Sequence, residues 1–221
     1  MEGEGIQQMY ITKFKFVPPP VFHLLFPDVI WQSDCKKVLL TIDDSPSPDT
    51  PRVLDLLDRH KIKAAFFVNV PEIAKKQIIL REIASRGHLV ANHSLQHKNL
   101  RKIPSLLMAY QIVRSKDLLE QILGKEVKFF RPPYGSFDLE VYRKVDESGQ
   151  RLVMWTLLTG DYSGDEKLAT YNVKKYLTQK SIVVMHDNAK SKGVFEVTLE
   201  TLVNTVAKKQ YQFGEPEECL R

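Results

Sequence analysis

The chain has 221 residues, of which 43% are hydrophobic, and no break in its composition marks a second domain. A chain of this length can bury one sizeable core, so we expect a single globular unit. The formal net charge of +5 is scattered, without a run of five or six like charges, which argues against a nucleic-acid-binding protein.

The first segment of the chain, residues 1–36, mixes prolines with large apolar side chains, as in the stretch FVPPPVFHLLF. The prolines disfavour a helix or a central strand, yet the segment is too apolar for a free tail. We therefore expect an extended strap that packs across the main body, residues 37–221.

Two features bear on the compartment. The longest apolar run near the start, VFHLLF, is too short for a membrane span and lacks the basic flank and cleavage site of a signal peptide. A cytoplasmic location is therefore the default expectation. Cys35 and Cys219 lie near opposite ends of the chain, and their spacing indicates neither a metal site nor a redox pair, so a disulfide between them stays open.

After the strap, apolar and amphipathic segments alternate. Six short apolar runs predict strands buried on both faces, at residues 37–42, 63–69, 88–92, 127–132, 152–157 and 181–186. The segments between them predict helices, one with Pro51 in its first turn, two that end at Gly87 and Gly124, and one over residues 195–209. This alternation indicates parallel β/α units, and the chain length favours a barrel or distorted barrel over an open sheet.

Chemistry in such folds gathers at the C-terminal ends of the strands, and the adjacent carboxylates Asp43 and Asp44 lie at the end of the first strand. Because successive strand residues point to opposite faces, one of them is expected to face a reaction centre while the other turns aside onto a metal. The following stretch, SPSPDT, is rich in turn-forming residues, so capping of a turn is the alternative explanation.

A second group follows the third strand, where His93 and His97 are four residues apart. If a helical turn begins here, both rings lie on one face and can hold one metal ion. With Asp44 they form a set of two histidines and one carboxylate, which suits Zn²⁺ or another divalent first-row metal. Such pairs also occur by chance on surface helices, which is the alternative for this spacing.

Three more strand ends carry polar residues. In FFRPPYG, the paired prolines stiffen the loop after Arg131, and Asp43 is the carboxylate we expect this arginine to meet, although a solvated arginine is the alternative. Asp161 follows a strand that contains tryptophan, and His186 ends the last strand. Asp161 is positioned to orient His186 and raise its pKa, as a general acid requires, whereas a buried structural histidine is the alternative.

The stretches TIDDSP, HSLQH, RPPYG, the tryptophan-to-aspartate segment and VMH, in this order, resemble the five motifs of the polysaccharide deacetylase family. This family is carbohydrate esterase family four, also called the NodB-homology domain. The resemblance runs from about residue 37 to residue 208. It implies a distorted (β/α) barrel, with its active site at the C-terminal ends of the strands, that hydrolyses N- or O-acetyl groups from sugars with a divalent metal.

The resemblance implies a catalytic role for four residues. Asp43 would be the general base for a metal-activated water, and Arg131 would hold this base ionised. His186 would be the general acid that protonates the leaving amine or alcohol, and Asp161 would tune it. Metal and acid–base residues together are sufficient for the hydrolysis of an amide.

The resemblance also implies a metal site and a substrate pocket. The metal ligands would be Asp44, His93 and His97, with Zn²⁺ expected and Co²⁺ or Ni²⁺ as alternatives. The backbone N–H of Tyr134 would stabilise the oxyanion, and Trp155 and Val184 would help to shape the acetyl pocket.

The chain departs from the family pattern at three positions. Ser45 stands where motif one usually has glycine, which costs the turn some freedom or places a hydroxyl near the site. In motif four, Leu158 replaces a frequent aspartate and Tyr162 replaces the usual tryptophan. These changes bear on the range of substrates more than on catalytic competence.

The expected function is the removal of acetyl groups from N-acetylated amino-sugar carbohydrate, by a hydrolase acting on carbon–nitrogen bonds other than peptide bonds. The expected partner is an acetylated oligo- or polysaccharide. An O-acetyl esterase, a small-amide hydrolase of the same fold, and a catalytically weak sugar-binding homologue are the alternatives. Asp43 and His186 disfavour the last, because binding needs neither a base nor an acid. Iron-dependent oxygen chemistry is disfavoured, because the usual His-x-Asp spacing is missing.

Overall fold

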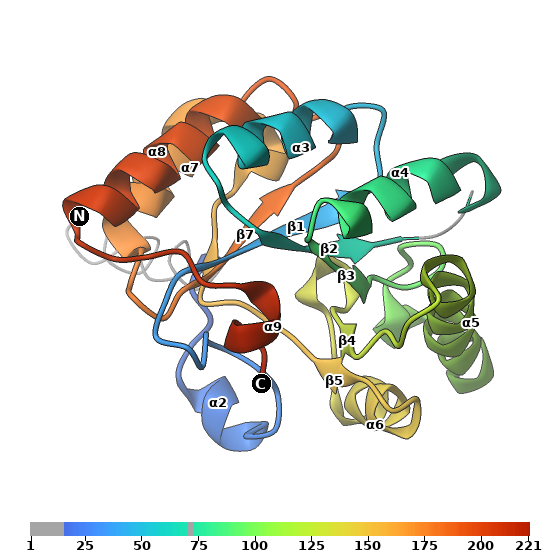
Figure 1. Cartoon of the computed structure of the whole chain (residues 1–221). Helices are drawn as coiled ribbons and strands as arrows, with labels where there is room; N and C mark the ends of the chain where they lie inside the picture. Colours follow the sequence, from blue (N-terminus) through green and yellow to red (C-terminus); the bar gives the residue numbers. More distant parts are fainter. Residues whose placement is uncertain (1–15, 70–72) are drawn as a thin grey trace.

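The computed structural model describes residues 16–69 and 73–221. Seven parallel strands form one sheet in the order β5-β4-β3-β2-β1-β7-β6. The strands are β1 Leu39–Ser45, β2 Ala64–Val68, β3 Leu89–Asn92, β4 Phe129–Phe130, β5 Arg151–Leu152, β6 Leu157–Leu158 and β7 Ile182–His186. The sheet is curled, with helices around its outer side, so the expected distorted (β/α) barrel is confirmed (Figure 1).

The helices follow the strands in the expected alternation. They are α2 Val21–Leu25, α3 Thr50–Arg59, α4 Ile73–Ser85, α5 Ser105–Leu123, α6 Leu139–Glu147, α7 Glu166–Tyr176, α8 Phe195–Lys208 and α9 Pro216–Cys219. Pro51 lies in the first turn of α3, and Gly124 caps α5 in the left-handed conformation, as the sequence predicts. Two helices, α6 and α7, were not expected from the sequence; they begin at the side-chain caps Asp138 and Asp165.

One predicted strand, residues 152–157, is divided in the structure. Its two ends belong to β5 and β6, which lie at opposite edges of the sheet, and residues 153–156 cross between them. Val153, Met154 and Trp155 are nevertheless buried. A continuous apolar run indicates burial, and here the buried residues cross the core between the two edge strands instead of forming one strand.

The side chains of the strands alternate between two apolar clusters. The outer cluster lies between the sheet and helices such as α3 and α8, and its strand residues include Leu40, Ile42, Phe66, Val183 and Met185. The inner cluster fills the concave side and includes Leu39, Phe67, Ala91, Ile182 and Val184. Residues that continue the inner series at a strand end therefore point into the mouth of the barrel.

The described part of the N-terminal segment packs on the barrel, as Ile30 bridges to Val153 and Trp31 is buried. The expectation that this segment contains no helix is wrong for α2, where one short turn follows the prolines instead of running through them. Cys35 and Cys219 form a disulfide, which settles the alternative left open above. Residues 1–15 lie outside the described residues, and the boundary at residue 36 stays a prediction.

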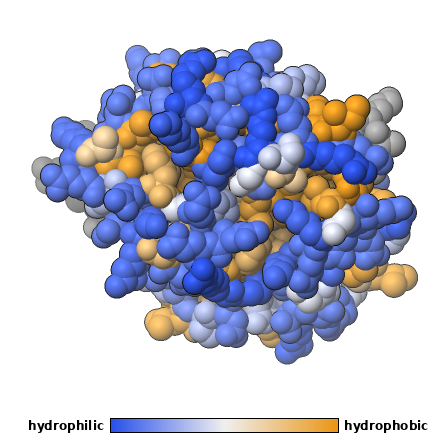
Figure 2. All heavy atoms as spheres, in the orientation of Figure 1, coloured by the Kyte–Doolittle hydropathy of each residue, from blue (hydrophilic) through white to orange (hydrophobic). Residues whose placement is uncertain are grey.

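The surface of the molecule is mainly polar on the face seen in Figure 2, with hydrophobic side chains gathered in smaller patches. Among the helices of the described ranges, none has the length and apolar character needed to cross a membrane.

Candidate active site

A cavity of about 330 Å³ opens at the C-terminal ends of the strands. This volume is within the range of small-ligand pockets. The residues that line it are Asp43, Asp44, His93, His97, Tyr134, Gly135, Trp155, Leu158, Tyr162 and His186. Seven of the ten predicted site residues therefore line one cavity. The other three, Arg131, Asp161 and Val184, are fully buried behind its wall.

Asp43 continues the inner series of β1 and meets Arg131 in the core. The guanidinium Nη1 donates to Asp43 Oδ1 at 2.7 Å and to the hydroxyl of Thr41 at 2.7 Å. Its other nitrogens donate to the backbone carbonyls of Val153 and Met154. The arginine has no exposed surface, so these contacts fix it as the buried ion-pair partner of Asp43.

Asp44 reaches the same cavity because the strand does not alternate here. Its φ is 68°, and the register with β2 shifts between Asp43 and Ser45. The expectation that the two carboxylates point to opposite faces is therefore wrong, because the bulge at Asp44 turns its side chain towards the histidines. Burial opposes ionisation of Asp44, but the hydrogen bond from His97 and the nearby imidazoles lower its pKa well below the ordinary value.

His93 and His97 come together without a helix. The segment after β3 is a loop in which Ser94 and His97 have left-handed φ values of 70° and 51°. Side chains satisfy its backbone, since the Ser94 N–H donates to Asn92 and the His97 N–H donates to the Ser94 hydroxyl. The predicted pair is thus brought together, but the helical turn proposed for it is wrong because these local hydrogen bonds replace helical ones.

The three predicted ligands fit a metal ion. One potential ligand atom from each of Asp44, His93 and His97 lies within 4.8 Å of the other two. His93 Nδ1 is 2.7 Å from the carbonyl of Arg131, so its Nε2 is left to face Asp44. Burial lowers the pKa of His93 despite the charge of Asp43, which favours the neutral ring that binds metal. A carboxylate with two imidazoles suits Zn²⁺, Co²⁺ or Ni²⁺.

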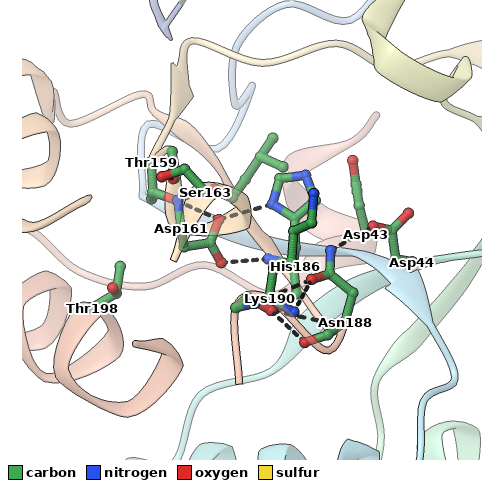
Figure 3. Close-up of polar contacts among 12 residues, drawn as sticks. Asp43, Asp44, Thr159, Asp161, Ser163, His186, Asn188, Lys190 and Thr198 are labelled. Carbon is green, nitrogen blue, oxygen red and sulfur yellow. Dashed lines mark hydrogen bonds and ion pairs between the residues drawn. The ribbon is translucent and has the colours of Figure 1, made fainter. Parts of the chain in front are cut away.

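His186 ends β7 on the same inner face and pairs with Asp161. Its Nδ1 is 2.8 Å from Asp161 Oδ1, and its backbone N–H donates to Asp161 Oδ2 at 2.7 Å (Figure 3). The hydroxyl of Thr159 also donates to this buried carboxylate. Because Asp161 holds Nδ1, the remaining nitrogen Nε2 is the one available for exchanging a proton with a substrate.

The loop after β4 forms another wall of the cavity. Tyr134 has a left-handed φ of 61°, and its ring lies against His97 with the centroids 4.7 Å apart. Asp44, His97 and Tyr134 therefore all line the cavity in a backbone conformation that costs of order 1–3 kcal/mol per residue. Such strain persists only where the surrounding structure imposes it, and it gathers here at the cavity.

Gly135 leaves room for Trp155. A Cβ atom at this position would lie 2.2 Å from Trp155 Cη2, and the φ of Gly135 is 61°. We expect Gly135→Ala to push the indole ring from its place and to lower substrate turnover by 10-fold or more, roughly the effect of a 1 Å displacement in a site. Gly149→Ala, where nothing lies within 4 Å at a similar φ of 73°, is the control. Equal activity of both variants in a steady-state assay would contradict this prediction.

The departures from the family pattern have clear places in the structure. The Ser45 hydroxyl donates to Asp187 at 3.1 Å and lies behind the cavity. Ser45 does not have a positive φ, so glycine is not needed there. Leu158 and Tyr162 line the cavity, and the Tyr162 ring is 5.2 Å from the ring of His186. Val184 lies deeper on β7 and does not line the cavity.

The polar residues of the loop after β7 were not among the predicted site residues. Asp187 is buried, and its backbone N–H donates to the carbonyl of Asp43 at 2.9 Å. Its carboxylate accepts hydrogen bonds from the hydroxyls of Ser45, Ser47 and Thr50. The only sequence signal was an aspartate next to His186, at the end of an apolar strand.

The protein is therefore a distorted (β/α) barrel with a polar site at its mouth. Two carboxylates and three imidazoles meet there in one cavity at the ends of the parallel strands. Comparison with known proteins gives the family. The profile described as Polysaccharide deacetylase matches residues 32–153, more than half of the chain. The chain belongs to the polysaccharide deacetylase family, as its motifs indicate.

Relatives of the chain include both enzymes and a pseudoenzyme. A peptidoglycan-N-acetylglucosamine deacetylase of Bacillus cereus is 33% identical over 152 residues, which cover 68% of this chain and 55% of the relative. The structure of the Bc1960 peptidoglycan N-acetylglucosamine deacetylase is 27% identical, with a TM-score of 0.80 over 87% of this chain and 93% of that one. BA3943 of Bacillus anthracis, a pseudoenzyme of carbohydrate esterase family four, is 26% identical, with a TM-score of 0.77 over 88% and 69%.

The comparisons thus establish family and fold. The chain spans about half the length of the first Bacillus cereus relative. Because one neighbour with the same fold is a pseudoenzyme, activity has to be argued from the residues in the cavity.

Proposed function

We propose that this protein is a metal-dependent hydrolase that removes acetyl groups from N-acetylated amino-sugar carbohydrate. The observation that carries the proposal is the meeting, in one cavity, of a buried carboxylate base, a carboxylate-supported imidazole and three metal-ligand side chains. Two relatives that act on N-acetylglucosamine in peptidoglycan, by their names, support the choice of substrate.

Asp44, His93 and His97 would hold the metal. A divalent cation at this site supplies Lewis-acid chemistry, because it polarises a carbonyl and lowers the pKa of water towards about 7. The protein favours the ligand forms of these side chains, since the pKa of Asp44 and the pKa of His93 are both lowered and the Nδ1 of His93 is tied to a carbonyl.

Asp43 and His186 divide the transfer of protons. Asp43, paired with the guanidinium of Arg131, accepts a proton from the attacking water. His186, held protonated by Asp161, donates a proton from Nε2 to the nitrogen of the leaving amino sugar. The environments of the two side chains differ in charge. The Asp43 carboxylate contacts the buried guanidinium of Arg131, whereas the His186 imidazole contacts the buried carboxylate of Asp161.

The remaining walls would hold the acetyl group. Trp155 and Leu158 offer apolar surface beside the catalytic residues, and Leu158 in place of a carboxylate keeps this side of the cavity uncharged. The backbone N–H of Tyr134 is proposed to stabilise the oxyanion, which is one reason for the strained loop to be maintained.

Two of the alternative functions differ from the proposed one in the substrate, and the third lacks catalysis. An O-acetyl esterase would use the same residues with an alcohol as leaving group, and a small-amide hydrolase would use them on a smaller substrate. A sugar-binding homologue without catalysis is disfavoured by the intact base and acid pairs.

The location of the protein is also a proposal. The disulfide between Cys35 and Cys219 favours an oxidising compartment over the cytoplasm that was the default expectation, because cytosolic reductants keep most thiols reduced.

The charge pair at His186 predicts the pH dependence. Burial alone would lower the pKa of His186, but the charge of Asp161 and its hydrogen bond outweigh this and raise the pKa to about 9. A general acid loses activity as the pH rises through its pKa, so the alkaline limb of the kcat/KM profile should move to lower pH in Asp161→Asn. A profile of kcat/KM against pH for both metal-loaded proteins measures the shift, and an unchanged alkaline limb would contradict the assigned roles.

The proposed function is tested by acetate release from N-acetylglucosamine oligomers, using metal-stripped protein with and without Zn²⁺ or Co²⁺. We expect release that depends on the added metal. Acetylated xylan and small amides are assayed in parallel, and release from these alone would favour the alternatives. If the protein binds metal but releases acetate from none of the substrates, the catalytic assignment is wrong.

A further inference from the structure

Asn188 contacts a proposed metal ligand from outside the ligand set. It lies in the loop between β7 and α8, two residues after His186. Its side-chain Nδ2 donates to Asp44 Oδ2 at 2.9 Å (Figure 3). The other oxygen, Oδ1, is 3.1 Å from His97 Nε2 and 3.9 Å from His93 Nε2. Asn188 therefore holds Oδ2 of Asp44 in a hydrogen bond, while Oδ1 faces the two imidazoles.

The orientation of the Asn188 amide is set by the loop itself. Its Oδ1 accepts hydrogen bonds from the backbone N–H groups of Lys190 and Ser191, at 3.0 and 3.1 Å. Exchange of the amide oxygen and nitrogen would place an NH₂ group against two N–H donors. The oxygen therefore faces the loop, and the NH₂ group faces Asp44.

The loop that carries Asn188 is fastened to the motif that carries Asp44. The Asp187 N–H donates to the carbonyl of Asp43, and the Asp187 carboxylate accepts from hydroxyls of the turn after β1. The Ser191 hydroxyl donates to the carbonyl of His186 at 2.5 Å. These contacts leave Asn188 little freedom to move relative to Asp44.

We propose that Asn188 is a positioning residue that makes Asp44 a metal ligand through Oδ1 alone. An amide donor on Oδ2 opposes binding of the metal by both oxygens, which would use a coordination position that substrate and water need. Side chains that hold a metal ligand from behind typically contribute 10- to 100-fold to metal affinity. The proposal rests on the metal site of the proposed function.

The test compares metal affinities of variants at position 188. Asn188→Ala removes both the donor to Asp44 and the acceptor of the loop. Asn188→Ser retains an oxygen that accepts from the backbone N–H two residues later, but its hydroxyl is too short to reach Asp44. Lys190→Ala, at an exposed side chain of the same loop, is the matched control. Calorimetric titration of each metal-stripped protein with Zn²⁺ or Co²⁺ gives the Kd, and a thermal melt of each variant reports its folding.

We expect the Kd to rise about 10- to 100-fold in Asn188→Ala and Asn188→Ser, and to stay unchanged in Lys190→Ala. The visible absorption of bound Co²⁺ should change in the Asn188 variants, because the coordination by Asp44 changes. Metal binding by Asn188→Ser within about twofold of the unmodified protein, with the same Co²⁺ spectrum, would overturn the inference but leave the metal site intact. Failure of the unmodified protein to bind metal would overturn both this inference and the proposed function.

Discussion

His186→Ala should lower the metal-dependent release of acetate by about 100- to 10,000-fold, which is the usual contribution of a positioned acid or base. The variant removes the proton donor but keeps the two other hydrogen bonds to Asp161, from Thr159 and from the backbone N–H of residue 186. The fold and the affinity for metal should therefore persist. Steady-state kcat/KM, with the metal Kd measured in parallel, checks this expectation.

Asp43→Asn should cause a loss of the same order, because an amide cannot accept the proton of water. It also leaves the guanidinium of Arg131 buried without its counterion, which typically costs about 3–5 kcal/mol of stability. Its thermal melt therefore has to accompany the assay. Asp55→Asn and His60→Ala, outside the cavity, are matched controls that should keep full activity. Activity of His186→Ala within tenfold of the unmodified protein would refute the acid role.

Loss of the disulfide should lower the stability of the folded protein. The bond joins residues separated by 184 positions, so it restricts nearly the whole unfolded chain. Removal of a native disulfide typically costs about 2–5 kcal/mol, which corresponds to a melting temperature roughly 5–15 °C lower for a protein of this size. Thermal unfolding of the double variant Cys35→Ser/Cys219→Ser measures the change.

A reductant provides the control for this prediction. It should lower the melting temperature of the unmodified protein to that of the double variant and should leave the variant unchanged. The stabilising role would be contradicted if three melting temperatures were equal: that of the unmodified protein, that of the unmodified protein with reductant, and that of the double variant.

Hydrophobic periodicity predicted several strands correctly, and the positions of polar residues after these strands predicted which side chains meet. The positions of β1, β2, β3 and β7 follow from short apolar runs, and the five polar groups after the runs meet because parallel strands end at one edge. The pairing of Arg131 with Asp43 followed from the cost of burying either charge alone.

The three residues of the proposed metal site lie together as the sequence predicts, but the geometry that joins them was not predicted. Asp44 and His97 have positive φ values, which average rules assign to glycine. A bulge in β1, and not the alternation of strand residues, therefore turns Asp44 towards the site. A loop held by side-chain hydrogen bonds, and not a helical turn, brings His97 close to His93. Positions at which local rules fail are often functional, because only a maintained structure keeps such strain.

Other features depend on contacts between distant parts of the chain. Asn188 acts through Asp44, 144 positions earlier in the chain, and it lies just beyond the VMH motif without belonging to it. The division of residues 152–157 into β5 and β6 depends on which edge of the sheet each end joins. Pairing of the two cysteines likewise depends on the way the N-terminal segment and α9 meet under the barrel.

The disulfide also decides how the barrel would respond to mechanical force. Cys35 and Cys219 have their Cα atoms 4.7 Å apart and close the residues between them into a covalent ring. Tension applied before Cys35 and after Cys219 would first detach Ile30 from residues 152–154, and it would then pass through the sulfur bond and bypass the rest of the sheet. In single-molecule stretching the barrel would stay folded until reduction, after which roughly 600 Å of chain would become available to extend. A protein pulled on from both sides would thus keep the cavity at its strand ends outside the path of the load.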